Sequence, residues 1–117
     1  MADLQDVVAR LRTFVAARDW AQFHDPKNLA MAVASEAGEL CGVFRWVANA
    51  DADDFVRSPE HRPAVEDEVA DVAICLLLLC DRAGISLPDA MLRKIDANER
   101  RYPVELARGK SEKPVVG

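Results

Sequence analysis

The stretch "LAMAVASEAGELCGVFRW", residues 29–46, repeats apolar side chains at the spacing of an α-helix and places two glutamates among them. The apolar stripe extends one residue beyond this stretch and consists of Leu29, Val33, Leu40, Val43, Phe44 and Val47. Glu36 falls on that stripe, and Glu39 follows three residues later on the same face. Two carboxylates on a buried face are costly unless a cation binds them or water reaches them. The stretch therefore predicts a long helix with a charged site where a core would otherwise form.

Helical spacing recurs along the rest of the chain, and no segment alternates with the period of a strand. The four predicted helices cover residues 3–19, 26–47, 59–83 and, opening at 86–89, the segment up to Pro103. The expected end signals are the N-caps Asp3, Asp25 and Ser58, the first-turn prolines Pro26 and Pro59, and Gly84 beyond the third helix. Residues 48–58 are expected to form an acidic linker.

These segments predict an all-α fold, a four-helix bundle-type chain. Residues 1–103 would form the domain, and residues 104–117 an extended or flexible C-terminal tail. The second and third predicted helices are apolar on more than one side, which a unit of this size cannot cover by itself. We therefore expect the chain to assemble through helix faces into a homodimer or homotetramer.

Composition excludes several classes of protein. The 117 residues contain 15 basic and 20 acidic side chains, a formal net charge of -5, which disfavours a nucleic-acid surface. Cys41, Cys75 and Cys80 lie in apolar surroundings without metal-site spacing and are expected to be buried, reduced thiols. The N-terminus does not resemble a signal peptide, and the longest apolar run, Val72–Cys80, is too short to span a membrane. We expect a soluble, cytoplasmic protein.

A second acidic motif, "VEDEVADVAI", opens the most apolar part of the third predicted helix at residues 65–74. Asp71 lies three residues after Glu68 and four after Asp67, so it can share a face with either. Helical geometry favours Glu68 with Asp71 and leaves Asp67 possible. If the second and third helices pack together, this pair and the pair formed by Glu36 and Glu39 converge.

Converging carboxylates without a histidine favour Mg²⁺, or Mn²⁺, over zinc or iron. Protein sites usually leave part of the Mg²⁺ coordination to substrate phosphates, which indicates nucleotide or pyrophosphate chemistry. The simpler alternative is a pair of solvated acidic faces that make surface ion pairs. A diiron bundle is disfavoured, because the sequence has no Glu-x-x-His motif.

These motifs together resemble a known family. The spacing Glu36-x-x-Glu39 followed by Glu68-x-x-Asp71 is similar to the E-x-x-E…E-x-x-D signature of the MazG-like superfamily of all-α nucleoside triphosphate pyrophosphohydrolases. The segments "RDWAQFHDPKNL" (18–29), "FRW" (44–46), "EDEVADV" (66–72) and "KIDANERRYP" (94–103) look most like the dCTP pyrophosphatase group. The resemblance extends over about residues 12–103.

The resemblance implies Mg²⁺-dependent hydrolysis of a nucleoside triphosphate to the monophosphate and pyrophosphate. It implies a metal site made of Glu36, Glu39, Glu68 and Asp71, which selects Glu68 over Asp67. One carboxylate could activate the attacking water, and Glu36 or Glu39 is preferred for that catalytic role. The implied phosphate-binding residues are Lys94, Asn98, Arg101 and Tyr102, which would otherwise belong to a solvated helix face and its end.

A base-binding pocket is also implied. Its matching aromatic residues are Trp20, Phe23, His24 and Trp46, which the pattern alone would place in the core or at a helix end. Leu11 and Cys75 occupy pocket positions where dCTP-specific relatives carry His and Tyr. Loss of two polar side chains weakens discrimination between bases, so a modified dCTP is a candidate substrate alongside dCTP. The alternatives are a hydrolase that prefers dUTP or dUDP, and a non-catalytic helical module that binds nucleotides.

Overall fold

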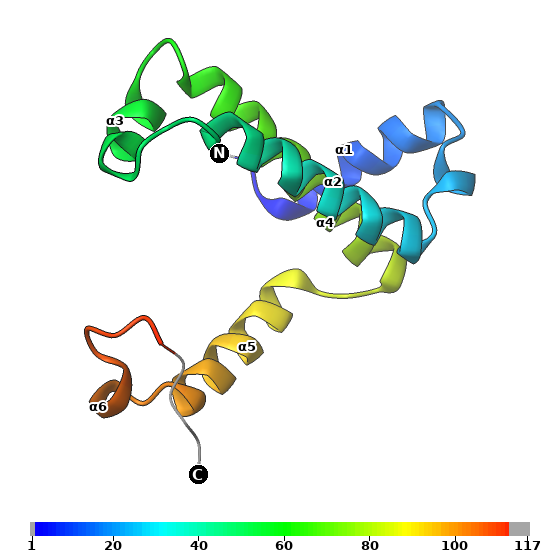
Figure 1. Ribbon diagram of the computed structural model, residues 1–117. Helices are drawn as coiled ribbons and strands as arrows, with labels where there is room; N and C mark the ends of the chain where they lie inside the picture. The colour runs from blue at the N-terminus through cyan, green and yellow to red at the C-terminus, as the bar shows by residue number, and fades with distance from the viewer. Residues whose placement is uncertain (1, 113–117) are drawn as a thin grey trace. The chain divides into compact units, whose positions relative to one another are not determined.

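Two long helices, α2 (Pro26–Phe44) and α4 (Arg62–Ala83), form the framework of the first part of the chain. In the computed structural model they lie side by side and run in opposite directions (Figure 1). The structure describes residues 2–112, and the chain divides into two compact units, Met1–Gly84 and Ile85–Gly117. Every regular element among residues 2–112 is helical, so the predicted all-α class is confirmed.

Helix α1 (Leu4–Ala17) contacts α4 within the first unit. It begins as predicted at Asp3, whose Oδ1 accepts a hydrogen bond from the backbone N–H of Asp6 at 2.9 Å. The helix ends two residues before Asp19, which adopts a left-handed conformation with φ of 53°. That conformation is uncommon for a residue other than glycine and turns the chain sharply after α1.

A short 3₁₀ helix, η1 (Ala21–Phe23), leads into α2. Asp25 is the N-cap of α2, as predicted, and its Oδ1 accepts from the backbone N–H of Asn28 at 2.9 Å. Pro26 occupies the first helical position, where its missing N–H costs nothing. Helix α2 ends at Phe44, three residues before the predicted end.

The predicted linker at residues 48–58 is wrong, because it contains η2 (Asn49–Asp51) and helix α3 (Ala52–Arg57). An aromatic series anchors α3: the ring of Phe55 lies 5.5 Å from that of Phe44 and stacks at 4.3 Å on His61. The predicted start of the third helix is also displaced. Ser58 ends α3 instead, and α4 begins at Arg62. These contacts join α3 to residues outside it, so the periodicity within the segment did not reveal them.

Helix α4 ends as predicted at Gly84, which takes the left-handed conformation with φ of 68°. The second unit contains α5 (Leu87–Arg101) and α6 (Val104–Ala107). The short helix α6 occupies part of the predicted extended tail, because the carbonyl of Pro103 accepts from the N–H groups of Leu106 and Ala107. The end of that tail, residues 113–117, lies outside the described residues.

Few apolar side chains are enclosed within the described chain. Those that are buried are Val15, Leu29, Leu77 and Cys80. Large exposed side chains of the first unit include Leu4, Phe14, Met31, Trp46 and Val69.

The prediction of buried cysteines holds for Cys80, whereas Cys75 is half-buried and Cys41 is exposed. Cys41 follows Leu40 by one residue, which turns it about 100° away from the apolar stripe of α2. None of the described helices has the length and apolarity needed to cross a membrane.

Candidate active site

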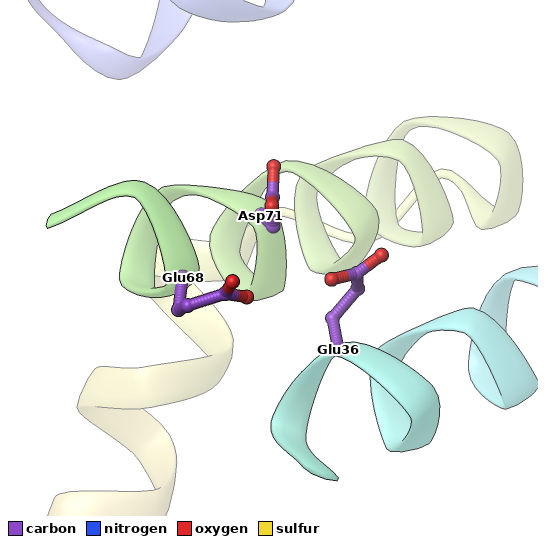
Figure 2. Close-up of side chains that lie close together, drawn as sticks. All are labelled: Glu36, Glu68 and Asp71. Atoms are coloured by element: carbon purple, nitrogen blue, oxygen red, sulfur yellow. The ribbon is translucent and has the colours of Figure 1, made fainter. Parts of the chain in front are cut away.

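Three carboxylates meet where α2 packs against α4. Oxygen atoms of Glu36, Glu68 and Asp71 all lie within 4.8 Å of one another. Figure 2 shows Glu36 extending from α2 towards α4, with the side chain of Glu68 turned towards it and Asp71 one turn further along α4. Glu39 is exposed and lies outside this group. Asp67, which the sequence pattern alone allowed, also lies outside it. We call Glu36, Glu68 and Asp71 the carboxylate cluster.

The electrostatics of the cluster are unfavourable without a counterion. Glu68 is half-buried, and its Oε2 is enclosed without a hydrogen-bond partner among the described residues. Burial raises the pKa of Glu68, and the negative charges of Asp71, Glu39 and Glu36 raise it further. An enclosed carboxylate oxygen without a partner is rare in folded proteins. A cation at this point would satisfy that oxygen and neutralise the repulsion.

The donors in the cluster are all carboxylate oxygens, so the cluster could hold a hard divalent cation. The thiol of Cys75 lies close to the same charges. Burial raises the pKa of Cys75, with further contributions from Glu36 and Asp71. The thiol is therefore kept protonated, and a protonated thiol is a poor metal ligand.

A cleft of about 550 Å³ lies between α1 and α4 and reaches Asp71 of the carboxylate cluster. Its lining is mostly apolar and includes three of the predicted base-binding residues, Leu11, Trp20 and His24. The predicted base-binding residues did not include the rest of the lining, which consists of Val7, Arg10, Phe14, Val15, Ile74 and Leu78, together with Asp71. Helical spacing could have found them, since residues 7, 11 and 14 share one face of α1, and residues 71, 74 and 78 share one face of α4.

The other predicted base-binding residues do not line this cleft. Phe23 and Trp46 are exposed, with Trp46 at 87% relative accessibility. Neither ring is therefore a core residue of this chain. Cys75 is half-buried on α4, one turn after Asp71, and is also absent from the lining.

Trp20 is held at the cleft by its neighbours. The ring of Phe14 meets it edge-on at a centroid distance of 5.6 Å. The guanidinium of Arg18 lies over the Phe14 ring, 3.7 Å from its centroid. The left-handed residue Asp19 directly precedes Trp20, and its backbone carbonyl accepts from the side-chain amide of Gln22 at 3.0 Å. The indole of Trp20 therefore forms an aromatic wall of the cleft that reaches Asp71 of the carboxylate cluster.

The predicted phosphate-binding residues belong to the second unit. Lys94 is exposed and Asn98 half-buried on α5, where their spacing of four places them on one face. The backbone N–H of Tyr102 donates to the carbonyl of Asn98 at 2.8 Å and closes the end of α5. Arg101 places its guanidinium 5.5 Å from the centre of the Tyr102 ring. Their role towards phosphates stays a prediction.

The all-helical fold and its carboxylate cluster agree with the comparison to known families. The model of the MazG-like family matches residues 31–114, a range that contains most of α2, the whole carboxylate cluster and α5. The chain therefore belongs to the MazG-like family, as the sequence motifs indicated.

Individual proteins with known names are similar to this chain. The chain is 43% identical to dCTP pyrophosphatase 1 of Homo sapiens over 110 residues and 42% identical to that of Bos taurus over 106. These alignments cover 94% and 91% of the chain but only 65% and 63% of the relatives, so the chain spans slightly less than two thirds of their length. A crystal structure of a pyrophosphatase from Archaeoglobus fulgidus is similar with a TM-score of 0.80 and 39% identity, covering 88% of this chain and 94% of that one.

Proposed function

We propose that this protein is a divalent-metal-dependent nucleoside triphosphate pyrophosphohydrolase, with Mg²⁺ as its metal and Mn²⁺ as a substitute. The substrate class is a pyrimidine (deoxy)nucleoside triphosphate such as dCTP or a modified dCTP. The observation that carries this proposal is the carboxylate cluster, which borders an apolar cleft walled by Trp20. The relatives named dCTP pyrophosphatase 1 support it.

Glu36, Glu68 and Asp71 would hold the metal, because their oxygens already converge and the enclosed Oε2 of Glu68 lacks a partner. The bound cation would supply charge neutralisation for the triphosphate and for the leaving pyrophosphate. Glu39 was predicted both as a ligand and as a catalytic carboxylate. Its exposed position outside the cluster favours the catalytic role, in which it orients the attacking water and accepts its proton. The water oxygen bonds to the α-phosphorus, and the bridging oxygen leaves with pyrophosphate.

The cleft is proposed to take the base. Indole and phenyl rings bind flat aromatic bases by stacking, which does not depend strongly on base identity. Leu11 lines the cleft without a hydrogen-bonding group, and Cys75 stands where dCTP-specific relatives carry Tyr. We therefore propose a selectivity broader than strict recognition of cytosine. Trp46 and Phe23 stay proposed contacts to the base, and Lys94, Asn98, Arg101 and Tyr102 stay proposed contacts to the phosphates.

The exposed apolar side chains support assembly through helix faces into a dimer or tetramer, which sedimentation at several protein concentrations would test. An enzyme of this kind would remove surplus or non-standard nucleotides in the cytoplasm.

The deciding experiment measures products with purified protein and Mg²⁺. The panel contains dCTP, 5-substituted dCTP analogues, dUTP and dUDP. We expect one pyrophosphate and one monophosphate from each hydrolysed triphosphate, and a loss of activity in Glu39→Ala. Orthophosphate as the product would contradict the reaction assignment. Nucleotide binding without hydrolysis would favour the non-catalytic alternative, and a preference for dUDP would favour the dUTP/dUDP alternative.

A further inference from the structure

We propose that the ion pair between Arg12 and Asp81 is a positioning device that holds α1 against α4 and so sets the geometry of the substrate cleft. The inference rests on the proposed function only in assigning the base to that cleft. Neither residue lines the cleft, so the pair acts through the residues that do.

The pair is a forked contact between two helices that are far apart in sequence. Nε of Arg12 donates to both carboxylate oxygens of Asp81, at 3.1 Å to Oδ1 and 3.0 Å to Oδ2, and Nη2 of Arg12 also donates to Oδ1. Asp81 is the sheltered partner, with 26% of its side chain exposed, whereas Arg12 is 65% exposed. A planar guanidinium fixes direction as well as distance, so this contact constrains how α1 lies on α4.

Helix α1 depends on this contact because little else secures it. Val15 is the only residue of α1 that is buried. Among the described residues, the Arg12–Asp81 pair provides the only side-chain hydrogen bonds between α1 and α4. A helix of 14 residues is only marginally stable without tertiary contacts. Loss of the pair should therefore raise the population in which α1 has moved away from α4.

The position of the pair links it to the cleft. Val15 and Leu78 line the cleft on one side and a smaller cavity of about 200 Å³ on the other, and Arg12 and Asp81 line that second cavity. The ion pair therefore lies behind the cleft wall. Asp81 follows Asp71 by ten residues, a rise of roughly 15 Å along the helix, so the pair is remote from the carboxylate cluster.

Arg82, the next residue of α4, makes a second contact with this part of the chain. Nη1 of Arg82 donates to the backbone carbonyl of Ala21 at 3.1 Å, which secures η1 directly after Trp20. The last turn of α4 thus secures the chain both before and after Trp20. Displacement of α1 would disturb the aromatic wall and leave the carboxylates of α2 and α4 in place.

This arrangement predicts a defect in substrate binding without a defect in chemistry. In Arg12→Met we expect KM for dCTP to rise about fivefold, because fewer molecules have an assembled cleft. We expect kcat to change by less than about twofold, since the metal-binding residues are unaffected. Arg62→Met is the matched control. It removes a guanidinium paired with Glu66 of the same helix at 2.8 Å and hydrogen-bonded to the Val56 carbonyl of α3 at 3.4 Å. Neither partner belongs to α1, so KM should stay within about twofold.

The double variant Arg12→Asp with Asp81→Arg reverses the charges and should recover most of the lost affinity. A reversed pair that binds as weakly as Arg12→Met would contradict the positioning role, as would an unchanged KM or an equal loss in kcat. Circular dichroism confirms that each variant is folded before its kinetics are compared.

A measurement without nucleotide separates this proposal from the proposed function. Amide hydrogen exchange in α1 should be about fivefold faster in Arg12→Met than in wild type, and unchanged in Arg62→Met. If the wild-type protein hydrolyses no triphosphate, the proposed function fails and the exchange result still decides the role of the ion pair. Unchanged exchange in α1 of Arg12→Met would refute that role.

Discussion

Replacement of Glu36 by Gln should change stability in opposite directions with and without metal. Glu36 and Asp71 have carboxylate oxygens within 4.8 Å of each other and no cation between them in the metal-free protein. At that separation two unit charges repel by about 0.9 kcal/mol in bulk water, the appropriate reference because Asp71 is exposed. Removing one charge without changing the shape should stabilise the metal-free protein and raise its Tm by roughly 3 °C.

In the presence of metal, wild type should be more stable than Glu36→Gln. A ligand present at a hundred times its Kd stabilises the folded state by about 2.7 kcal/mol, or roughly 10 °C in Tm. Glu36→Gln replaces a charged ligand by a neutral amide. If affinity falls by at least about tenfold, the stabilisation at the same metal concentration falls to about 1.4 kcal/mol or less. Pyrophosphate release should decrease by about a hundredfold or more, because a proposed ligand is lost.

The assay is thermal unfolding at fixed protein concentration, with EDTA and then across a titration of MgCl₂ or MnCl₂. Glu66→Gln is the control, because Glu66 is an acidic residue of α4 outside the carboxylate cluster and should leave the response to metal unchanged. A Glu36→Gln protein that is less stable in EDTA and keeps the full metal response would refute the metal-site reasoning.

Other consequences of the structure can be measured separately. The raised pKa of Glu68 means that the folded state binds more protons than the unfolded state, so from this group alone metal-free stability should increase as pH falls from neutral through that pKa, while the Tm gain from metal shrinks. A Tm gain that is constant across this range would contradict the assignment. Leu29→Ala should cost about 2–4 kcal/mol in urea unfolding, since only 3% of Leu29 is exposed. Asp25→Ala should lower the free energy of unfolding by about 1 kcal/mol through loss of the N-cap of α2, and Asp25→Asn should keep most of the wild-type stability. Gly38→Ala should stabilise the protein by about 0.5–1 kcal/mol, because a Cβ there meets no atom within 4 Å. A loss of stability in that variant would indicate a second chain packed at this position.

Local end signals in the sequence located most of the helices. Asp3, Asp25 and Gly84 mark helix ends in the structure as they did in the sequence. Caps are readable because each depends on residues three or four positions away. Helix α3 was missed because Phe55, which anchors it, contacts Phe44 and His61 from outside its own short helix, beyond the reach of capping and helical periodicity.

For the candidate site too, local spacing indicated some of the features and helix packing decided the others. The spacing of Glu68 and Asp71 on one helical face is a local property, so the sequence indicated that these carboxylates belong together. The sequence could not decide which of Glu36 and Glu39 activates water and which only binds metal, because both share a face with the apolar stripe. The packing of α2 on α4 brings Glu36 into the carboxylate cluster and leaves Glu39 outside it.

The amino-acid sequence by itself therefore determined the helical class, the main helix ends and the acidic residues of the candidate site. These follow from periodicity and capping, which act within one or two helical turns. The tertiary structure alone decided which carboxylate oxygens meet, where the cleft runs, and that Arg12 pairs with Asp81 across 69 residues of chain. Those features depend on how one helix lies against another, and helical periodicity does not specify that orientation.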